Sequence, residues 1–282
     1  MGSTSLTSTT GAVMNPAITS KEIIDIREAN LGFEATVSRK YYDEARVGTT
    51  IRWTIITART ASTKSEGNSG NDITYVADTE TSVTLTINQH QYAAFELEEF
   101  EESLSIIDQQ KVYTRRCVYA VNLAIDDTLA ALPDDFTQIV GTLAVDLTDD
   151  DVRRAVQYLD DAITPGEDRF FAIAPATKNS MLAIDRYASS DFNRGGGANI
   201  VKGEFGNIYG LRTWMSTNIE GTNAAGHDNG IYQRDAIALG MRMQPRTRTF
   251  DDINNLSTQV AVSAIWGVIE TRDDHGVFAR GA

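Results

Sequence analysis

The sequence has almost no cysteine and few histidines. Cys117 is the only cysteine in 282 residues, which excludes an internal disulfide and a zinc site built from several cysteines. His90, His227 and His275 are far apart, and none lies in a metal-ligand spacing such as H-x-x-x-H. We interpret them as ordinary polar histidines and expect neither a bound metal nor another cofactor.

Long apolar runs are also missing. No stretch approaches the roughly 20 apolar residues that a membrane-spanning helix needs, and residues 1–5 lack the basic and apolar blocks of a signal peptide. We expect a protein without membrane segments that is made and kept in the cytosol. Its composition, 41% hydrophobic and 23% charged, allows one large core or two smaller ones.

Positive charge is scarce as well. Lysine and arginine together number 25 against 39 acidic residues, giving a net charge of −14. Such a surface repels phosphate backbones, which disfavours sequence-specific DNA binding. A protein that only encloses DNA needs no attraction to it, so the charge is compatible with a container, and equally with most soluble bacterial proteins.

The chain begins with a segment that has no hydrophobic period. Residues 1–16 are rich in serine, threonine and glycine, so they bury too little apolar area to offset the entropy of ordering. We expect a flexible or partner-bound arm. A short helix or extended segment at 21–27 should rest on another element.

A period of two, typical of half-buried strands, appears twice with a polar stretch between, residues 60–72. The apolar positions are Ile51, Trp53 and Ile55 in the first run and Val83, Leu85 and Ile87 in the second. The pattern predicts a long two-stranded hairpin with a mobile tip. Because two strands alone bury too little area, we expect it to lean on another subunit, the alternative being an internal hairpin of a compact sheet.

The stretch from Asp108 to Leu132 has helical periodicity, with Asp108 as a plausible N-cap and Pro133 as the stop signal. A helix of this length spans ~36 Å. Its apolar stripe consists of Val118, Val121, Ile125, Leu129 and Leu132.

After Pro133 the signals alternate between helix and strand, which predicts a mixed region at 148–245. The expected elements are a helix capped by Thr148 and Asp149 to Asp151, a strand at 170–173, a helix at 181–187, a loop at 194–197, a turn and strand at 203–218, a strand at 235–243 and a final strand at 259–271.

The order of these pieces resembles the tailed-phage major capsid family, whose Hong Kong phage-type coat fold is shared with herpesvirus shells and encapsulins. No single motif is specific, and the resemblance depends on order and spacing. The matching segments are 46–53, 83–87 and 91–95 for the two sides of the E-loop, 124–126 in the spine helix, 203–211 with its G-x-x-G-x-I-x-G pattern, 227–239 and 259–272.

The resemblance implies an α+β fold with five parts. They are an N-terminal arm at 1–44, an extended E-loop hairpin at 45–91, a peripheral domain with the long spine helix at 92–147, an axial domain at 148–245, and a return strand of the peripheral domain with the C-terminus at 246–282.

The implied function is a major capsid protein, not an enzyme. Such a protein self-assembles through hexamers and pentamers into the icosahedral virion head, built in the host cytoplasm around double-stranded DNA. Because the strand pattern begins within the first fifty residues, without a long scaffolding segment before it, we expect a scaffolding protein in trans. Portal and decoration proteins are the other implied partners.

The resemblance also implies site residues. The E-loop contacts with a neighbouring subunit are assigned to Trp53, Lys64, Glu66 and Tyr75. Some family members join an E-loop lysine to an asparagine of a neighbour, for which Lys64 and either Asn254 or Asn255 are the candidates. The segment Arg194, Gly195, Gly196 and Gly197 lacks the Lys-Ser/Thr of a P-loop, so we interpret it as an axial-domain loop.

Two alternatives remain at this point. An encapsulin has the same fold but encloses a cargo enzyme. A small hydrolase would combine a histidine and an aspartate with the glycine loop, and would be a compact monomer. The acidic run of Glu96, Glu98, Glu99, Glu101 and Glu102 alternates with apolar residues, so we interpret it as a solvated strand or turn rather than as paired catalytic carboxylates.

Overall fold

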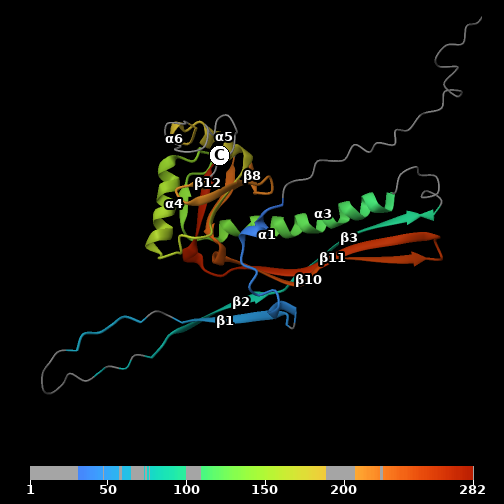
Figure 1. Cartoon of the computed structure of the whole chain (residues 1–282), viewed down its shortest axis with the longest axis horizontal. Helices are drawn as coiled ribbons and strands as arrows, with labels where there is room; N and C mark the ends of the chain where they lie inside the picture. Colours follow the sequence, from blue (N-terminus) through green and yellow to red (C-terminus); the bar gives the residue numbers. More distant parts are fainter. Residues whose placement is uncertain are drawn as a thin grey trace, which may run out of the picture.

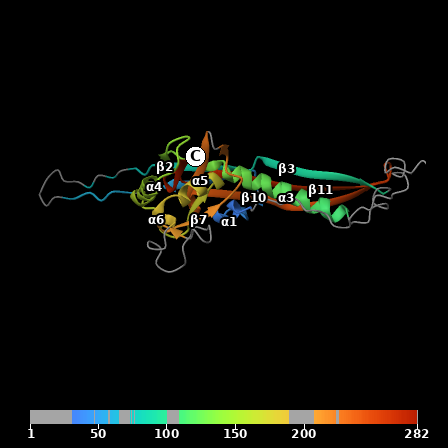
Figure 2. The ribbon, with the colours of Figure 1, turned by 90° about the horizontal axis from the view of Figure 1, so that it is seen from above.

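The structure of the protein is a computed structural model. It describes residues 31–46, 48–56, 59–64, 73, 75, 77–99, 109–188, 207–222 and 225–281. These residues form a compact α/β part, a long sheet with a helix on it, and a two-stranded ribbon. The ribbon and the long helix extend from the compact part in opposite directions, so the molecule is elongated (Figures 1 and 2).

The compact part is built on a seven-stranded sheet, here called the axial sheet, with strand order β4-β12-β9-β5-β7-β6 and β8 paired to β9. Its strands are β4 (Ile139–Gly141), β5 (Arg169–Ile173), β6 (Asn207–Ile208), β7 (Leu211–Met215), β8 (Gly221–Thr222), β9 (Gly226–Gln233) and β12 (Gly276–Gly281). Helices α4 (Asp149–Asp161), α5 (Pro175–Leu182) and α6 (Asp185–Ala188) accompany it. Phe171, Leu159, Ile231 and Val277 are among its fully buried side chains.

Helix α4 begins where the sequence predicts. Thr148 accepts a hydrogen bond from the Asp151 amide, and the Asp151 carboxylate accepts one from the Thr148 amide, which forms a capping box. Val152 and Leu159 are buried, and Val156 packs against the same core while partly exposed.

The elongated part is a three-stranded antiparallel sheet, here called the peripheral sheet, with order β10-β11-β3. Its strands are β10 (Ile237–Asp252), β11 (Ser257–Glu270) and β3 (Gln89–Glu98). Helix α3 (Gln109–Ala130) lies along one face (Figure 1). The helix is confirmed, with Val121, Ile125 and Leu129 buried against Val262 and Trp266 of β11. The predicted cap Asp108 lies outside the described residues.

Several strand assignments differ from the sequence-based expectation. Residues 91–95, expected on the returning side of the hairpin, belong to β3 and pair with β11. Strand β10 continues to Asp252 instead of ending at 243, and β11 is not the last strand, because β12 follows it. Strand β12 pairs with β4 and β9, so the axial sheet includes strands on both sides of the expected 148–245 boundaries. Helix α5 begins at Pro175 rather than near 181.

The ribbon consists of β1 (Thr50–Ile56) and β2 (Glu80–Thr86), paired antiparallel with Ile51 opposite Leu85 and Trp53 opposite Val83. This confirms the two predicted hairpin strands. The base of the ribbon has its own small core, in which Ala45, Ile51, Leu85 and Ile87 are buried against Ile265 and Ile269 of β11.

Two glycines let the ribbon cross the peripheral sheet closely. Gly240 of β10 and Gly267 of β11 lie directly opposite each other. A Cβ on Gly267 would lie 2.2 Å from the backbone oxygen of Thr86, and one on Gly240 would lie 2.5 Å from Cδ2 of Leu85. Only strands without side chains at these two positions allow β2 to pass at this distance.

The segment before the ribbon is attached through a buried aspartate. Asp126 of α3 accepts hydrogen bonds from the amides of Gly32 and Phe33, at 3.1 and 2.9 Å, and from Nδ2 of Asn218 at 2.8 Å. Burial raises the pKa of Asp126 above its usual range, although these three donors act against the shift. One carboxylate therefore joins the start of α1 (Phe33–Thr36), the long helix and the loop after β7.

No helix within the described ranges is long and apolar enough to cross a membrane.

The glycine crossing can be tested by substitution. Gly267→Ala places a methyl group against backbone, so we expect the free energy of unfolding to fall by about 1–3 kcal/mol. Gly166→Ala is the control, because nothing lies within 4 Å of its added Cβ, and a change within about 0.5 kcal/mol is expected there. Urea denaturation measures both, and equal stability of the two variants would contradict the close crossing.

Candidate functional site

The ribbon beyond its base is not covered by any other part of the described residues. Every described residue between β1 and β2 is exposed, and Tyr75 is 90% and Ile73 62% exposed. Arg59 and Asp78, 2.6 Å apart, join the two sides of the ribbon. Large apolar side chains on a projecting element are typical of a surface that meets a partner.

Of the four predicted contact residues, Tyr75 and Lys64 lie on this exposed part, and Glu66 lies outside the described residues. Trp53 lies nearer the base and stacks on Tyr41, with ring centroids 4.3 Å apart and planes 4° from parallel. Its Nε1 is buried without a hydrogen-bond partner among the described residues. Trp53 is thus already partly buried by residues of its own chain. Its contact with a neighbouring subunit stays a prediction.

The residues of the predicted cross-link lie on different elements. Asn254 and Asn255 are in the turn between β10 and β11, where the Asn254 amide and the Asn255 side chain both donate to Asp252 at 2.9 Å. Lys64 belongs to the segment between β1 and β2. The turn and the ribbon extend to opposite ends of the molecule (Figure 1), so a bond between them can only join two subunits.

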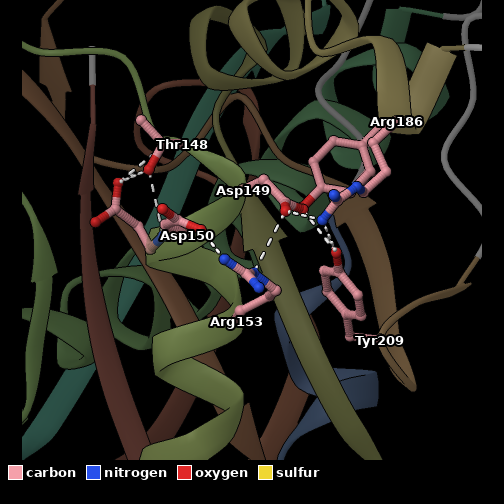
Figure 3. A network of polar contacts seen from close by, with 8 residues as sticks. Thr148, Asp149, Asp150, Arg153, Arg186 and Tyr209 are labelled. Atoms are coloured by element: carbon pink, nitrogen blue, oxygen red, sulfur yellow. Dashed lines mark hydrogen bonds and ion pairs between the residues drawn. The ribbon is translucent and has the colours of Figure 1, made fainter.

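A polar network connects the start of α4 to α6 and to the turn between β6 and β7 (Figure 3). Asp149, the first residue of α4, accepts hydrogen bonds from the hydroxyls of Tyr187 and Tyr209 at 2.6 and 2.7 Å, and it pairs with Arg186 and Arg153. Burial alone raises the pKa of Asp149, but the two hydroxyls and the two arginines outweigh it and hold the pKa below its usual range.

Tyr209 and Gly210 form the two-residue turn between β6 and β7, both with positive φ, 49° and 83°. Such turns need left-handed residues, and the hydrogen bond to Asp149 holds the tyrosine there. Tyr187 and Tyr209 stand on either side of residues 189–206, which contain the predicted loop from Arg194 to Gly197. That loop lies outside the described residues. The network attaches both flanking segments to one carboxylate, a role that the sequence did not reveal.

Two of the segments that connect the two sheets lie side by side. The amides of Thr271 and Arg272, after β11, both donate to the backbone oxygen of Ala236, before β10, at 2.7 and 3.4 Å. Glu270 stands at this junction, where burial raises its pKa to about 7, and Asp273, which is hydrogen-bonded to it, and Asp135 act in the same direction.

The three histidines of the hydrolase alternative lie on different elements, and its glycine loop lies outside the described residues. His90, His227 and His275 lie on β3, β9 and the turn before β12. Nε2 of His275 is 3.9 Å from Asp274, beyond hydrogen-bond distance, and burial lowers the pKa of His275. Within the described ranges, no group of three His, Cys, Asp or Glu side chains is arranged to hold a metal ion.

Solved structures share this arrangement over nearly the whole chain. A chain from Mycobacterium phage Che8 has a TM-score of 0.83 and 19% identity, with 94% of this chain and 96% of that chain covered. A chain from the capsid of the cyanophage P-SCSP1u has a TM-score of 0.78 and 15% identity, covering 97% and 94%. One from the mature capsid of bacteriophage PhiM1 has a TM-score of 0.75 and 13% identity, covering 94% and 91%.

The chain has the phage capsid fold. No protein-family model matches the sequence, and no curated protein matches it. The α+β prediction and the resemblance to the phage capsid fold are confirmed. Because more than nine-tenths of each chain is covered, the phage capsid fold accounts for both the compact part and the extended part of this molecule.

The raised pKa of Glu270 predicts how the stability of the fold depends on pH. The folded state binds this proton more tightly than the unfolded chain, whose glutamate has a pKa of about 4.3, so the free energy of unfolding should fall as the pH rises from about 4.3 to about 7. Glu270→Gln keeps a hydrogen-bond donor for Asp273 without the charge. We expect it to raise stability at pH 8 by about 1 kcal/mol, allowing for solvent screening.

Urea denaturation at pH 5 and pH 8 measures this difference. Glu167→Gln, the same substitution at an exposed glutamate, serves as the control and should keep the wild-type pH dependence. A Glu270→Gln variant that loses stability equally at both pH values would contradict the assignment.

Proposed function

We propose that the protein is the major coat protein of a tailed bacteriophage, which assembles into the icosahedral head around double-stranded DNA. The observation that carries the proposal is the likeness over nearly the whole chain to subunits of two phage capsids. The uncovered ribbon supports it independently, because a solitary globular enzyme gains nothing from a projecting apolar hairpin.

In this proposal each subunit is incomplete alone. The ribbon lies over an adjacent subunit and buries Ile73 and Tyr75 there. The axial sheet and its helices gather around the five-fold and six-fold axes of pentamers and hexamers. Many weak interfaces, each contributing about 25 cal/mol per Å² of buried apolar area, give a stable closed shell from reversible steps.

The acidic composition fits a wall that encloses DNA without binding its sequence. At a net charge of −14, the subunit does not attract the phosphate backbone as a whole. The further partners in this proposal are a scaffolding protein in trans, a portal protein and a decoration protein. The protein belongs to the virion head and is assembled in the host cytoplasm.

The first test is negative-stain microscopy of the purified protein, alone and with the scaffolding protein of the same phage. We expect rings or shells. A protein that stays monomeric at all concentrations in both conditions would overturn the proposal. Particles from the native host that contain an enzyme instead of DNA would assign the shell to an encapsulin.

The role of the ribbon is tested by deleting Thr60 to Asp72. Because the described residues of this segment have no contacts in the core, the variant should unfold at nearly the wild-type temperature. Its yield of particles should fall at least about tenfold, since the shortened ribbon no longer carries Ile73 and Tyr75 over the adjacent subunit and lacks Lys64 and Glu66. Tyr75→Phe, which keeps the apolar ring, is the control, and normal particles from the deletion would count against the ribbon.

The proposed covalent contact has its own test. An amide bond between Nζ of Lys64 and Cγ of Asn254 or Asn255 of another subunit forms with release of ammonia. It predicts a ladder of bands from mature particles on a denaturing gel, and the loss of that ladder in Lys64→Arg. Bands of monomer size alone would end the cross-link proposal while leaving the coat function intact.

A further inference from the structure

The peripheral sheet has two outer strands whose outer edges carry opposite charge. Strand β11 is in the middle, so β10 and β3 are the two edges. Helix α3 covers one face, where Val260, Val262 and Leu97 are buried. On the other face Tyr92 and Phe250 are 74% and 68% exposed.

Strand β10 carries the basic edge, formed by Arg242, Arg246 and Arg248. All three side chains are exposed. None of them forms an ion pair or hydrogen bond within the part of the chain that the structure describes. In a chain of net charge −14, three unpaired arginines along one strand mark a place where negative charge is expected from outside the subunit.

Strand β3 carries the acidic edge, formed by Glu96, Glu98 and the following Glu99, all exposed. Glu96 accepts hydrogen bonds from Ser257 and Gln259 of β11, which fixes its position. Glu98 and Glu99 have no ionic partner within the described ranges. Strand β11 holds the backbones of the two edges about 10 Å apart, and no ion pair joins the two edges among the described residues.

We propose that the basic edge of one subunit lies against the acidic edge of a second copy of this chain, in a head-to-tail contact between peripheral sheets. The inference rests on the proposed coat function. The two edges are different patches, so the contact is heterologous, and a heterologous contact forms rings when its rotation closes. Subunits around one capsomer need such a contact.

The competing two-fold arrangement is disfavoured by different features on the two edges. Exposed edge strands pair readily with other edges unless charge, proline or bulges prevent it. Two copies of β3 facing each other bring glutamate to glutamate. Strand β10 ends in Asp251 and Asp252, so its charges alone do not prevent self-pairing, but it contains Pro245 and two register shifts, between Met241 and Met243 and between Met243 and Arg246. Unlike edges attract each other, which favours head-to-tail over two-fold association.

Charge reversal with rescue tests the pairing. Arg246→Glu with Arg248→Glu reverses the basic edge, and Glu98→Arg with Glu99→Arg reverses the acidic edge. Each double variant should lower the yield of particles at least about tenfold, because like charges then face each other. The variant with all four changes should regain wild-type yield within about threefold, since both edges are reversed together.

The control is Arg246→Lys with Arg248→Lys, which keeps the charge at the same positions and should assemble normally. Thermal unfolding confirms that every variant is folded. Normal shells from either double reversal would overturn the proposal. A variant with all four substitutions that does not regain its particle yield would overturn it as well. Reversal of the arginines that leaves assembly intact but reduces DNA retention would assign them to nucleic acid. If wild-type protein assembles while these results contradict the pairing, the coat function still stands.

Discussion

The crossing of the ribbon over Gly240 and Gly267 is the constraint on which the arrangement of the subunit depends. At this point Leu85 and Thr86 of β2 lie against two positions, one on β10 and one on β11, that carry no side chain. The small core beside the crossing then fixes the direction of β1 and β2, which is away from the long helix. A bulkier residue on either strand would separate the ribbon from the sheet. The contacts within the chain therefore fix the direction of an apolar ribbon whose outer part is exposed in the described structure.

The features that the sequence predicts correctly are those with local signals. The stripe of α3, the alternation in β1 and β2 and the capping box of Thr148 each depend on residues within a few positions of one another. Pairings across long stretches of chain could not be read in this way. Strand β3 resembles a continuation of the hairpin in sequence, but its partner β11 lies more than 150 residues later. For the site, the exposed positions of Lys64 and Tyr75 follow from the hairpin pattern, whereas the Asp149 network joins residues from three separate elements.

One continuous core joins the two sheets. Phe170 of β5, Tyr232 of β9 and Phe278 of β12 are buried in the same cluster as Leu129 of α3 and Trp266 of β11, while a second core holds α4 and α5 against the axial sheet. Beside the shared core, the chain passes between the sheets through adjacent backbone segments at Ala236, next to Glu270, whose pKa is raised to about 7 by burial. The proposed recognition elements, the exposed part of the ribbon and the charged edges, contribute no residues to these two cores, so they can vary without unfolding the parts that carry them.

The position of β12 has a consequence for synthesis. This strand, residues 276–281, is inserted between the edge strand β4 and β9, and Val277, Phe278 and Ala279 are almost fully buried there. While a nascent chain is still on the ribosome, the gap between β4 and β9 stays open and both strands lack a neighbour. Only a polypeptide translated through β12 can close this gap, so an interrupted product keeps an unfinished sheet.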